Sequence, residues 1–287
     1  MTGYEALRQG AAIIDLSARG RIRATGEDRL RLLHAMTTNH VQEMRAGTSL
    51  YAFFLNAQGR ILADADIWCG AEAALVDVEP ETREKVFQHI DRYIIADDVT
   101  LEDVTETTAE IGVEGPGAEA LRREGIAIGN TVTGQPGFRL IVPVDEKEAL
   151  LAELRAAGAV EASAEEARAV RLENGRPRYG EDMTEANLAQ ETGQMRALHF
   201  NKGCYLGQEI VERVRSRGHV NRTLRALRIE GTDVPAAGTK VMSADKEAGE
   251  ITSAAYSPGE GCVRALAYLR TVENLSVAGA AAQAVQG

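Results

Sequence analysis

The chain has few cysteines, and their positions exclude several kinds of site. Only three occur in 287 residues, at Cys69, Cys204 and Cys262. No C-x-x-C pair is present, so a zinc knuckle is not indicated, and a four-thiolate iron–sulfur site does not fit within one chain. Cys69 and Cys262 lie in apolar-rich segments and are expected to be small core residues. We therefore expect no metal ligands, and the odd cysteine count suits a reducing compartment.

The sequence also lacks a membrane-spanning segment and a signal peptide. No apolar run approaches the ~20 residues that cross a bilayer. The first five residues, Met-Thr-Gly-Tyr-Glu, have neither the basic nor the apolar region of a signal peptide. Hydrophobic residues make up 44% of the chain and charged residues 26%, as in ordinary globular proteins. We expect a cytoplasmic protein with no membrane contact.

The order of apolar and turn residues predicts an α+β body followed by a small β-barrel. Residues 51–55 and 61–68 are two β-rich runs joined by a turn, which indicates a hairpin. Helical patterns alternate with such runs up to about residue 173, and Gly115-Pro116-Gly117 is expected to open a helix that reaches about residue 124. After Arg222 only short strands separated by Gly and Pro turns remain. The predicted domains are residues 1–221, with a hairpin or ferredoxin-like subdomain at about 45–140, and residues 222–287.

The stretch from Lys202 to Glu209 (K-G-C-Y-L-G-Q-E) concentrates reactive side chains as no other segment does. Its glycines let the backbone approach a ligand. A cation two residues from Cys204 favours the thiolate, which makes Cys204 and Lys202 the candidate catalytic residues. Gln208 and Glu209 could orient the lysine or bind a ligand. The alternative is a surface loop that leads into an arginine-rich helix or strand.

Asp64 and Asp66 form a second candidate site. They lie two residues apart on a predicted strand, so their side chains share one face. Two carboxylates on one face repel each other unless one meets a cation or a protonated partner.

The octapeptide resembles the signature of the YgfZ-type folate-binding proteins, which are relatives of the glycine-cleavage T-protein (aminomethyltransferase). Other segments agree with that family along nearly the whole chain. These segments are residues 22–28, residues 54–60, and R-L-E-N-G at 171–175 followed by Y-G-E-D at 179–182. The resemblance implies an aminomethyltransferase-like body of interwoven α/β subdomains and a C-terminal barrel. It also implies tetrahydrofolate, or a one-carbon derivative, as the ligand.

The resemblance further assigns the residues that contact the folate. Glu173 is expected to anchor the pterin, because one carboxylate can accept hydrogen bonds from the 2-amino group and the adjacent ring N–H. The expected cofactor-binding residues are Glu173, Arg171, Tyr179, Asp64, Gln208, Glu209 and Arg213.

The hairpin departs from the transferase pattern. Aminomethyltransferases read G-G-I-x-D-D there, whereas this chain has Arg60 for a glycine and Ala63 for the first aspartate. A missing carboxylate cannot act as a general base. The favoured hypothesis is therefore a folate-binding accessory protein, not a turnover enzyme. The resemblance to the YgfZ-type proteins implies that it supports iron–sulfur cluster assembly or repair in client proteins, with a link to tRNA modification. An authentic aminomethyltransferase and a non-catalytic RNA- or protein-binding scaffold are the alternatives.

Acidic residues outnumber basic ones, 43 to 32, but one segment reverses this balance. The formal net charge of −11 argues against nucleic-acid binding over the whole surface. The segment from Lys202 to Arg228 nevertheless contains many cations and only two carboxylates. Such a basic patch indicates a localised polyanion, either the γ-glutamyl tail of a folate or an RNA backbone. An amphipathic strand with solvent-facing arginines would give the same pattern.

Overall fold

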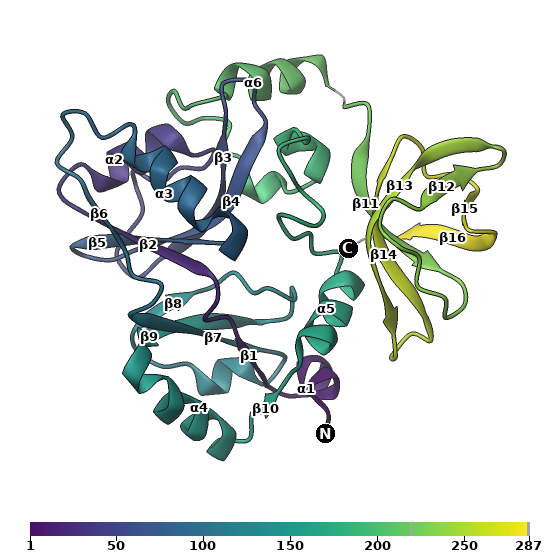
Figure 1. Cartoon of the computed structure of the whole chain (residues 1–287), viewed down its shortest axis with the longest axis horizontal. Helices are drawn as coiled ribbons and strands as arrows, with labels where there is room; N and C mark the ends of the chain where they lie inside the picture. The colour runs from purple at the N-terminus through teal and green to yellow at the C-terminus, as the bar shows by residue number, and fades with distance from the viewer. Residues whose placement is uncertain (219, 286–287) are drawn as a thin grey trace.

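The computed structural model describes residues 1–218 and 220–285, which form two five-stranded sheets and a closed six-stranded barrel. The sheets lie one above the other on one side of the molecule, and the barrel lies on the other side (Figure 1). The predicted α+β body with a C-terminal barrel is confirmed. None of the described helices is long and apolar enough to cross a membrane.

The first sheet has the strand order β3-β4-β5-β2-β6, and helices α2 and α3 cover its outer face. Apolar side chains of these helices, such as Leu33 and Ile90, pack with Ile22, Phe54 and Val76 of the strands. The bounds are β2 Gly20–Thr25, α2 Arg29–Met36, β3 Ser49–Leu55, β4 Ile61–Cys69, β5 Ala73–Val78, α3 Arg83–Asp91 and β6 Thr100–Asp103.

The second sheet has the order β10-β1-β7-β9-β8, and it is antiparallel except for the β1–β10 pair. Helix α4 packs on its outer face through Leu150, Leu151 and Leu154. Helices α1 and α5 pack on each other beside β1 and lie between this sheet and the barrel (Figure 1). The bounds are α1 Gly3–Gln9, β1 Ala12–Asp15, β7 Thr108–Glu114, β8 Ile126–Ile128, β9 Gly137–Pro143, α4 Lys147–Ala156, β10 Val160–Glu161 and α5 Ala164–Glu173.

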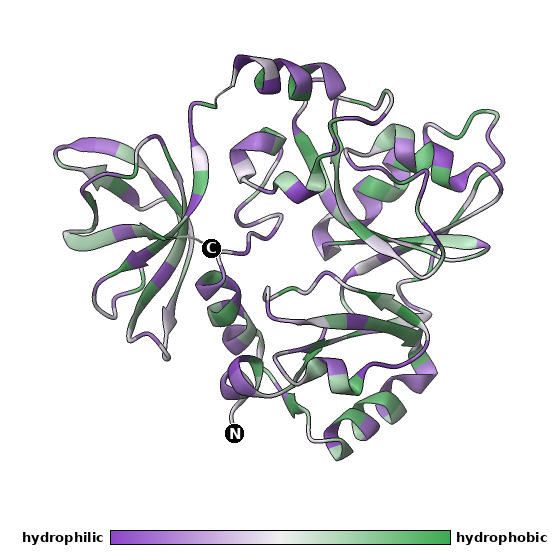
Figure 2. Ribbon diagram, turned by 180° about the vertical axis from the view of Figure 1, so that it is seen from behind, coloured by the Kyte–Doolittle hydropathy of each residue, from purple (hydrophilic) through white to green (hydrophobic). Residues whose placement is uncertain are grey.

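The barrel closes in the order β11-β14-β13-β12-β15-β16 around an aliphatic core. Helix α6 precedes it and is mostly hydrophilic, whereas the strands of the sheets and the barrel carry most of the hydrophobic residues (Figure 2). The bounds are α6 Gln208–Arg217, β11 Thr223–Ile229, β12 Lys240–Ser243, β13 Lys246–Ser257, β14 Cys262–Leu269, β15 Leu275–Val277 and β16 Ala280–Val285.

Three details differ from the sequence predictions. The subdomain expected at about 45–140 is not a unit, because β3–β6 belong to the first sheet and β7–β9 to the second. The helix expected after Gly117 is only a 3-10 turn, Ala118–Leu121, since this segment buries a single alanine fully. Helix α1 was not predicted, although Thr2 and Glu5 form a capping box at its start.

Candidate functional site

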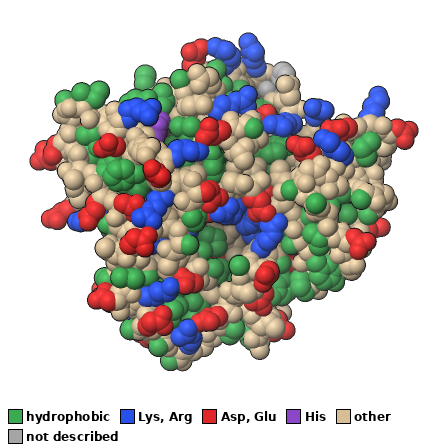
Figure 3. All heavy atoms as spheres, viewed as in Figure 1, with side chains coloured by type: hydrophobic (Ala, Val, Ile, Leu, Met, Phe, Trp, Pro, Cys, Tyr) green, Lys and Arg blue, Asp and Glu red, His purple; other side chains and the backbone are tan. Residues whose placement is uncertain are grey.

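A cavity of about 500 Å³ lies between the two sheets and the start of α5. Its walls mix apolar side chains with many charged ones. The space-filling view shows Lys and Arg gathered with Asp and Glu around a hollow in the middle of this face (Figure 3). The charged lining residues are Asp15, Arg19, Asp64, Asp66, Glu79, Arg168, Arg171, Arg176, Arg178, Glu181 and Arg196.

Strand β4 carries the two predicted aspartates to this cavity. Its burial does not alternate, because helices cover one face of the sheet and the second sheet covers the other. Ala63, Ala65 and Ile67 face the helices. Asp64 and Asp66 therefore point the other way, toward the second sheet, and both line the cavity. Their predicted common face is confirmed.

Asp64 is held by one side-chain hydrogen bond. The hydroxyl of Tyr51 donates to its Oδ2 at 2.8 Å, while its buried Oδ1 has no hydrogen-bond partner among the described residues. Burial, followed by the charge of Glu79, raises the pKa of Asp64 to about 7. The protein environment therefore favours the neutral form of this carboxyl group more than water does.

Asp66 is the neighbouring carboxylate, and it is fully engaged. Asn130 Nδ2 donates to both of its oxygens at 2.8 and 2.9 Å, and Arg139 forms an ion pair with Oδ2. Burial raises the pKa of Asp66, although the charge of Arg139 opposes that effect. Asp66 thus holds Asn130 and Arg139 in place, whereas Asp64 makes only one side-chain hydrogen bond within the described residues.

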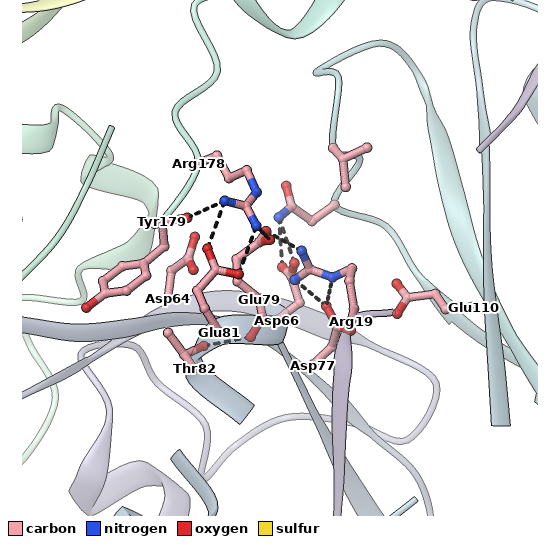
Figure 4. Close-up of polar contacts among 12 residues, drawn as sticks. Arg19, Asp64, Asp66, Asp77, Glu79, Glu81, Thr82, Glu110, Arg178 and Tyr179 are labelled. Carbon is pink, nitrogen blue, oxygen red and sulfur yellow. Dashed lines mark hydrogen bonds and ion pairs between the residues drawn. The ribbon is translucent and has the colours of Figure 1, made fainter. Parts of the chain in front are cut away.

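Behind the cavity lies a buried group that we call the inter-sheet cluster. Its members are Arg19, Asp64, Asp66, Asp77, Glu110 and Arg139, contributed by both sheets and the turn before β2. Figure 4 labels all of them except Arg139. Arg139 is fully buried and contacts Asp77 at 2.6 Å and Glu110 at 2.7 Å.

Burial acts differently on two carboxyl groups of the cluster. Burial and the charge of Asp77 raise the pKa of Glu110 to about 8, and the buried guanidinium of Arg21 lies 3.6 Å from its Oε2. Burial alone would also raise the pKa of Asp77, but Arg19 and Arg139 outweigh it and hold that pKa below its usual range. The two arginines therefore favour the ionised form of Asp77, whereas burial favours the neutral form of Glu110.

Two arginines converge at one edge of the cavity. Arg176 and Arg196 both donate to Oδ1 of Asn130, the latter at 2.7 Å, and the guanidinium of Arg196 lies 4.5 Å from the ring centre of Tyr51. Neither forms an ion pair among the described residues. Burial, and then the nearby charge of Arg196, lowers the pKa of Arg176.

Among the predicted folate contacts, Arg171 lines the cavity with Asp64. It forms ion pairs with Glu181 at 2.5 Å and Asp182 at 2.6 Å, and so holds the loop after α5. Tyr179 is buried and donates to the carbonyl of Ile61 at 3.2 Å, outside the cavity lining.

Glu173 lies elsewhere, at the junction of α1, α5 and the barrel. Its Oε1 accepts hydrogen bonds from Tyr4 at 2.7 Å and Ser257 at 2.5 Å, and Arg8 lies 3.4 Å from Oε2. The structure therefore does not bring Glu173 to the cavity, because its carboxylate points toward the barrel.

Gln208, Glu209 and Arg213 lie in α6 and also lie outside the cavity lining. Glu209 and Arg213 pair with each other at 2.5 Å on the exposed surface. The structure thus brings only Asp64 and Arg171 of the predicted folate contacts to the cavity and places the others outside its lining.

The octapeptide loop is anchored by Lys202. Its Nζ donates to the carbonyls of His34, Thr37 and Asn39 at 2.6, 2.5 and 2.7 Å, at the C-terminal end of α2. Burial lowers the pKa of Lys202 to about 7, yet three acceptors require the three N–H bonds of the ammonium form.

Cys204 is exposed, whereas Cys69 and Cys262 are buried as predicted. No hydrogen bond joins Lys202 to Cys204 within the described residues. The expectation that this lysine activates the thiol is therefore not supported by the contacts, because the ammonium is held by carbonyl groups.

The basic run is partly neutralised. Arg213, Arg215 and Arg222 lie within 3.6 Å of Glu209, Glu212 and Glu191 respectively, and Lys202 is buried. Arg225 and Arg228, both exposed on β11, form no ion pair among the described residues. His219, between α6 and the barrel, lies outside the described residues.

Comparisons with known proteins agree with this architecture. Residues 2–126 match the model of the GCVT N-terminal domain, and residues 222–285 match the glycine cleavage T-protein C-terminal barrel domain. The chain is 29% identical to an aminomethyltransferase of Rubrobacter xylanophilus, over 93% of this chain and 78% of that protein. It is 25% identical to a chloroplastic protein of Arabidopsis thaliana whose name describes a transferase, over 89% of this chain but only 64% of the relative's length.

The fold is also shared with a solved structure. The crystal structure of the glycine cleavage system aminomethyltransferase T from Bartonella henselae superposes with a TM-score of 0.89 at 17% identity, covering 99% of this chain and 87% of that one. At this identity the likeness establishes the fold alone.

Proposed function

Because the chain belongs to the aminomethyltransferase superfamily, we propose that its inter-sheet cavity binds tetrahydrofolate and that Asp64 exchanges a proton during one-carbon transfer. Proteins of this superfamily bind tetrahydrofolate. The observation that carries the proposal is that Asp64, a buried carboxyl group held through one oxygen by Tyr51, lines this cavity.

The residues of the cavity fit such a ligand. Apolar walls that include Ile14, Leu16 and Val132 suit a ring system, and arginines at the edges suit its carboxylates. The carboxyl group of Asp64 lines the cavity and makes only one side-chain hydrogen bond within the described residues, so it retains capacity to accept another from a ligand. When bound, tetrahydrofolate supplies the ring nitrogens that carry the one-carbon unit.

A one-carbon transfer needs a group that gains or loses a proton near neutral pH. Asp64, with its pKa raised to about 7, has that property, and Tyr51 holds its other oxygen. The absence of the first aspartate of the transferase hairpin, at Ala63, does not remove this carboxyl group. We therefore propose folate-dependent transfer in preference to binding without turnover.

Binding of tetrahydrofolate by calorimetry, with Asp64→Asn, tests the proposal. Loss of the charged acceptor should weaken binding by roughly 1.5–3 kcal/mol. The wild-type affinity should increase as the pH rises through about 7, because only the ionised carboxylate accepts at both oxygens, and this increase should be absent in Asp64→Asn. Glu173→Gln is the matched control, since Glu173 lies outside the cavity. If Glu173→Gln weakens binding and Asp64→Asn does not, the pterin lies at Glu173 and our assignment is wrong.

A second candidate function is favoured by the exposed thiol of Cys204 in the octapeptide loop. We propose, as that alternative, support of iron–sulfur cluster assembly or repair in client proteins, including enzymes of tRNA modification. In cells that lack the protein and have low iron–sulfur enzyme activity, Cys204→Ala should then fail to restore activity. If Cys204→Ala restores iron–sulfur enzyme activity as well as the wild type does, and Asp64→Asn does not restore it, the result would favour folate chemistry alone.

A further inference from the structure

A groove lies between the barrel and the loops that follow α5, and its charged lining side chains are all arginines among the described residues. It has a volume of about 590 Å³ and is lined by Arg176, Arg196 and Arg225, with no aspartate or glutamate among the described residues that line it. This is unusual for a protein with a formal net charge of −11. A groove of one charge focuses the electrostatic potential and attracts the opposite charge.

The groove and the cavity share a boundary. Arg176 and Arg196 line both spaces, and both donate to the same amide oxygen of Asn130. Two guanidinium groups that share one neutral acceptor repel each other, and an anion between them would relieve that repulsion. The boundary is therefore suited to a carboxylate that passes from the cavity into the groove.

The floor of the groove is apolar. Leu224, Ala226, Leu266 and Val285 of the barrel line it together with Met195, which is 48% exposed. A suitable ligand thus combines aliphatic segments with regularly spaced negative charges. RNA offers bases for stacking, but no aromatic side chain lines the groove within the part of the chain that the structure describes.

We propose that this groove binds the oligo-γ-glutamyl tail of a polyglutamylated folate, whose ring system occupies the cavity. The inference rests on the proposed function and deepens it. Each γ-linked residue adds one α-carboxylate and two methylene groups. Arg176 and Arg196 receive the first carboxylates, Arg225 receives a later one, and the methylene groups pack on the apolar floor.

The test compares tetrahydrofolate with one and with five glutamyl residues. Each carboxylate–arginine contact at this exposed site should change Kd by roughly two- to fivefold, so the pentaglutamate should bind more tightly to the wild type. The preference should shrink as salt is added. Arg225→Ala should reduce the preference by roughly two- to fivefold and leave monoglutamate binding unchanged. Arg228→Ala removes an exposed arginine that lies on the same strand but outside the groove. It should change neither the preference for the pentaglutamate nor the affinity for the monoglutamate.

The outcomes separate the two proposals. Equal affinity of the wild type for both forms would overturn the groove assignment and leave the folate proposal intact. Failure of both forms to bind would overturn the proposed function and this inference together. An RNA oligonucleotide that binds more weakly to Arg225→Ala, without any pentaglutamate preference, would assign the groove to RNA instead.

Discussion

The inter-sheet cluster and the octapeptide loop are both rich in polar side chains, yet they are assembled in opposite ways. The loop is contiguous in sequence, and its lysine turns inward to complete the end of α2. The cluster combines residues of β4, β5, β7, β9 and the turn before β2, and two of its members, Asp64 and Asp66, line a cavity. Density of reactive residue types along the chain therefore does not indicate which side chains the fold brings together.

If the cluster holds the two sheets together, Arg139→Met should give the largest loss of stability. It would remove the cation that Asp66, Asp77 and Glu110 share. Asp66 would then have no ion pair among the described residues, whereas Asp77 would keep Arg19 and Glu110 would keep Arg21. Breaking a buried ion pair from one side typically costs about 3–5 kcal/mol, because the remaining charges stay buried. Denaturant unfolding measures this change.

Arg23→Met is the matched control for that measurement. Arg23 pairs with Glu102 at 3.3 Å, and both side chains are at least half exposed. Its loss should change the free energy of unfolding by less than about 1 kcal/mol. Similar values for the two variants would show that the cluster adds no more to stability than a surface ion pair.

Lys202→Met should cause the next largest loss in the free energy of unfolding, because this lysine of the octapeptide loop is a structural residue. Three carbonyl groups near the end of α2 would lose their donor. We expect a loss of roughly 2–4 kcal/mol in the free energy of unfolding. Lys85→Met, which removes an exposed pair with Glu185 at 2.5 Å, should cost less than about 1 kcal/mol. A Lys202→Met variant as stable as Lys85→Met would contradict this role.

The same contrast explains what the sequence could and could not predict. The spacing of Asp64 and Asp66 was sufficient to place both on one face, because strand side chains alternate. Their partner Arg139 was not predicted, since nothing local indicates that β9 lies opposite β4. Glu173 was assigned by resemblance, but the direction of its side chain depends on how α5 packs against the barrel. Contacts between distant strands depend on tertiary packing, which residue patterns do not encode locally.

Cys204→Ala should have the smallest effect on stability. The thiol is exposed and makes no hydrogen bond among the described residues, and surface substitutions of this kind usually change the free energy of unfolding by less than about 0.5 kcal/mol. Cys262→Ala is the contrasting variant, because Cys262 is only 1% exposed on β14, and it should cost about 1 kcal/mol.

Alkylation tests the same difference without a substitution. Cys204 should react first in the folded protein, whereas Cys69 and Cys262 are buried, and burial raises the pKa of both. Labelling of Cys69 or Cys262 before Cys204 would show that the loop is closed in solution. If Cys204 is labelled first and Cys204→Ala has the same free energy of unfolding as the wild type, folding does not require this thiol. The loop would then combine an inward lysine that the fold needs with an outward thiol that is free for a partner.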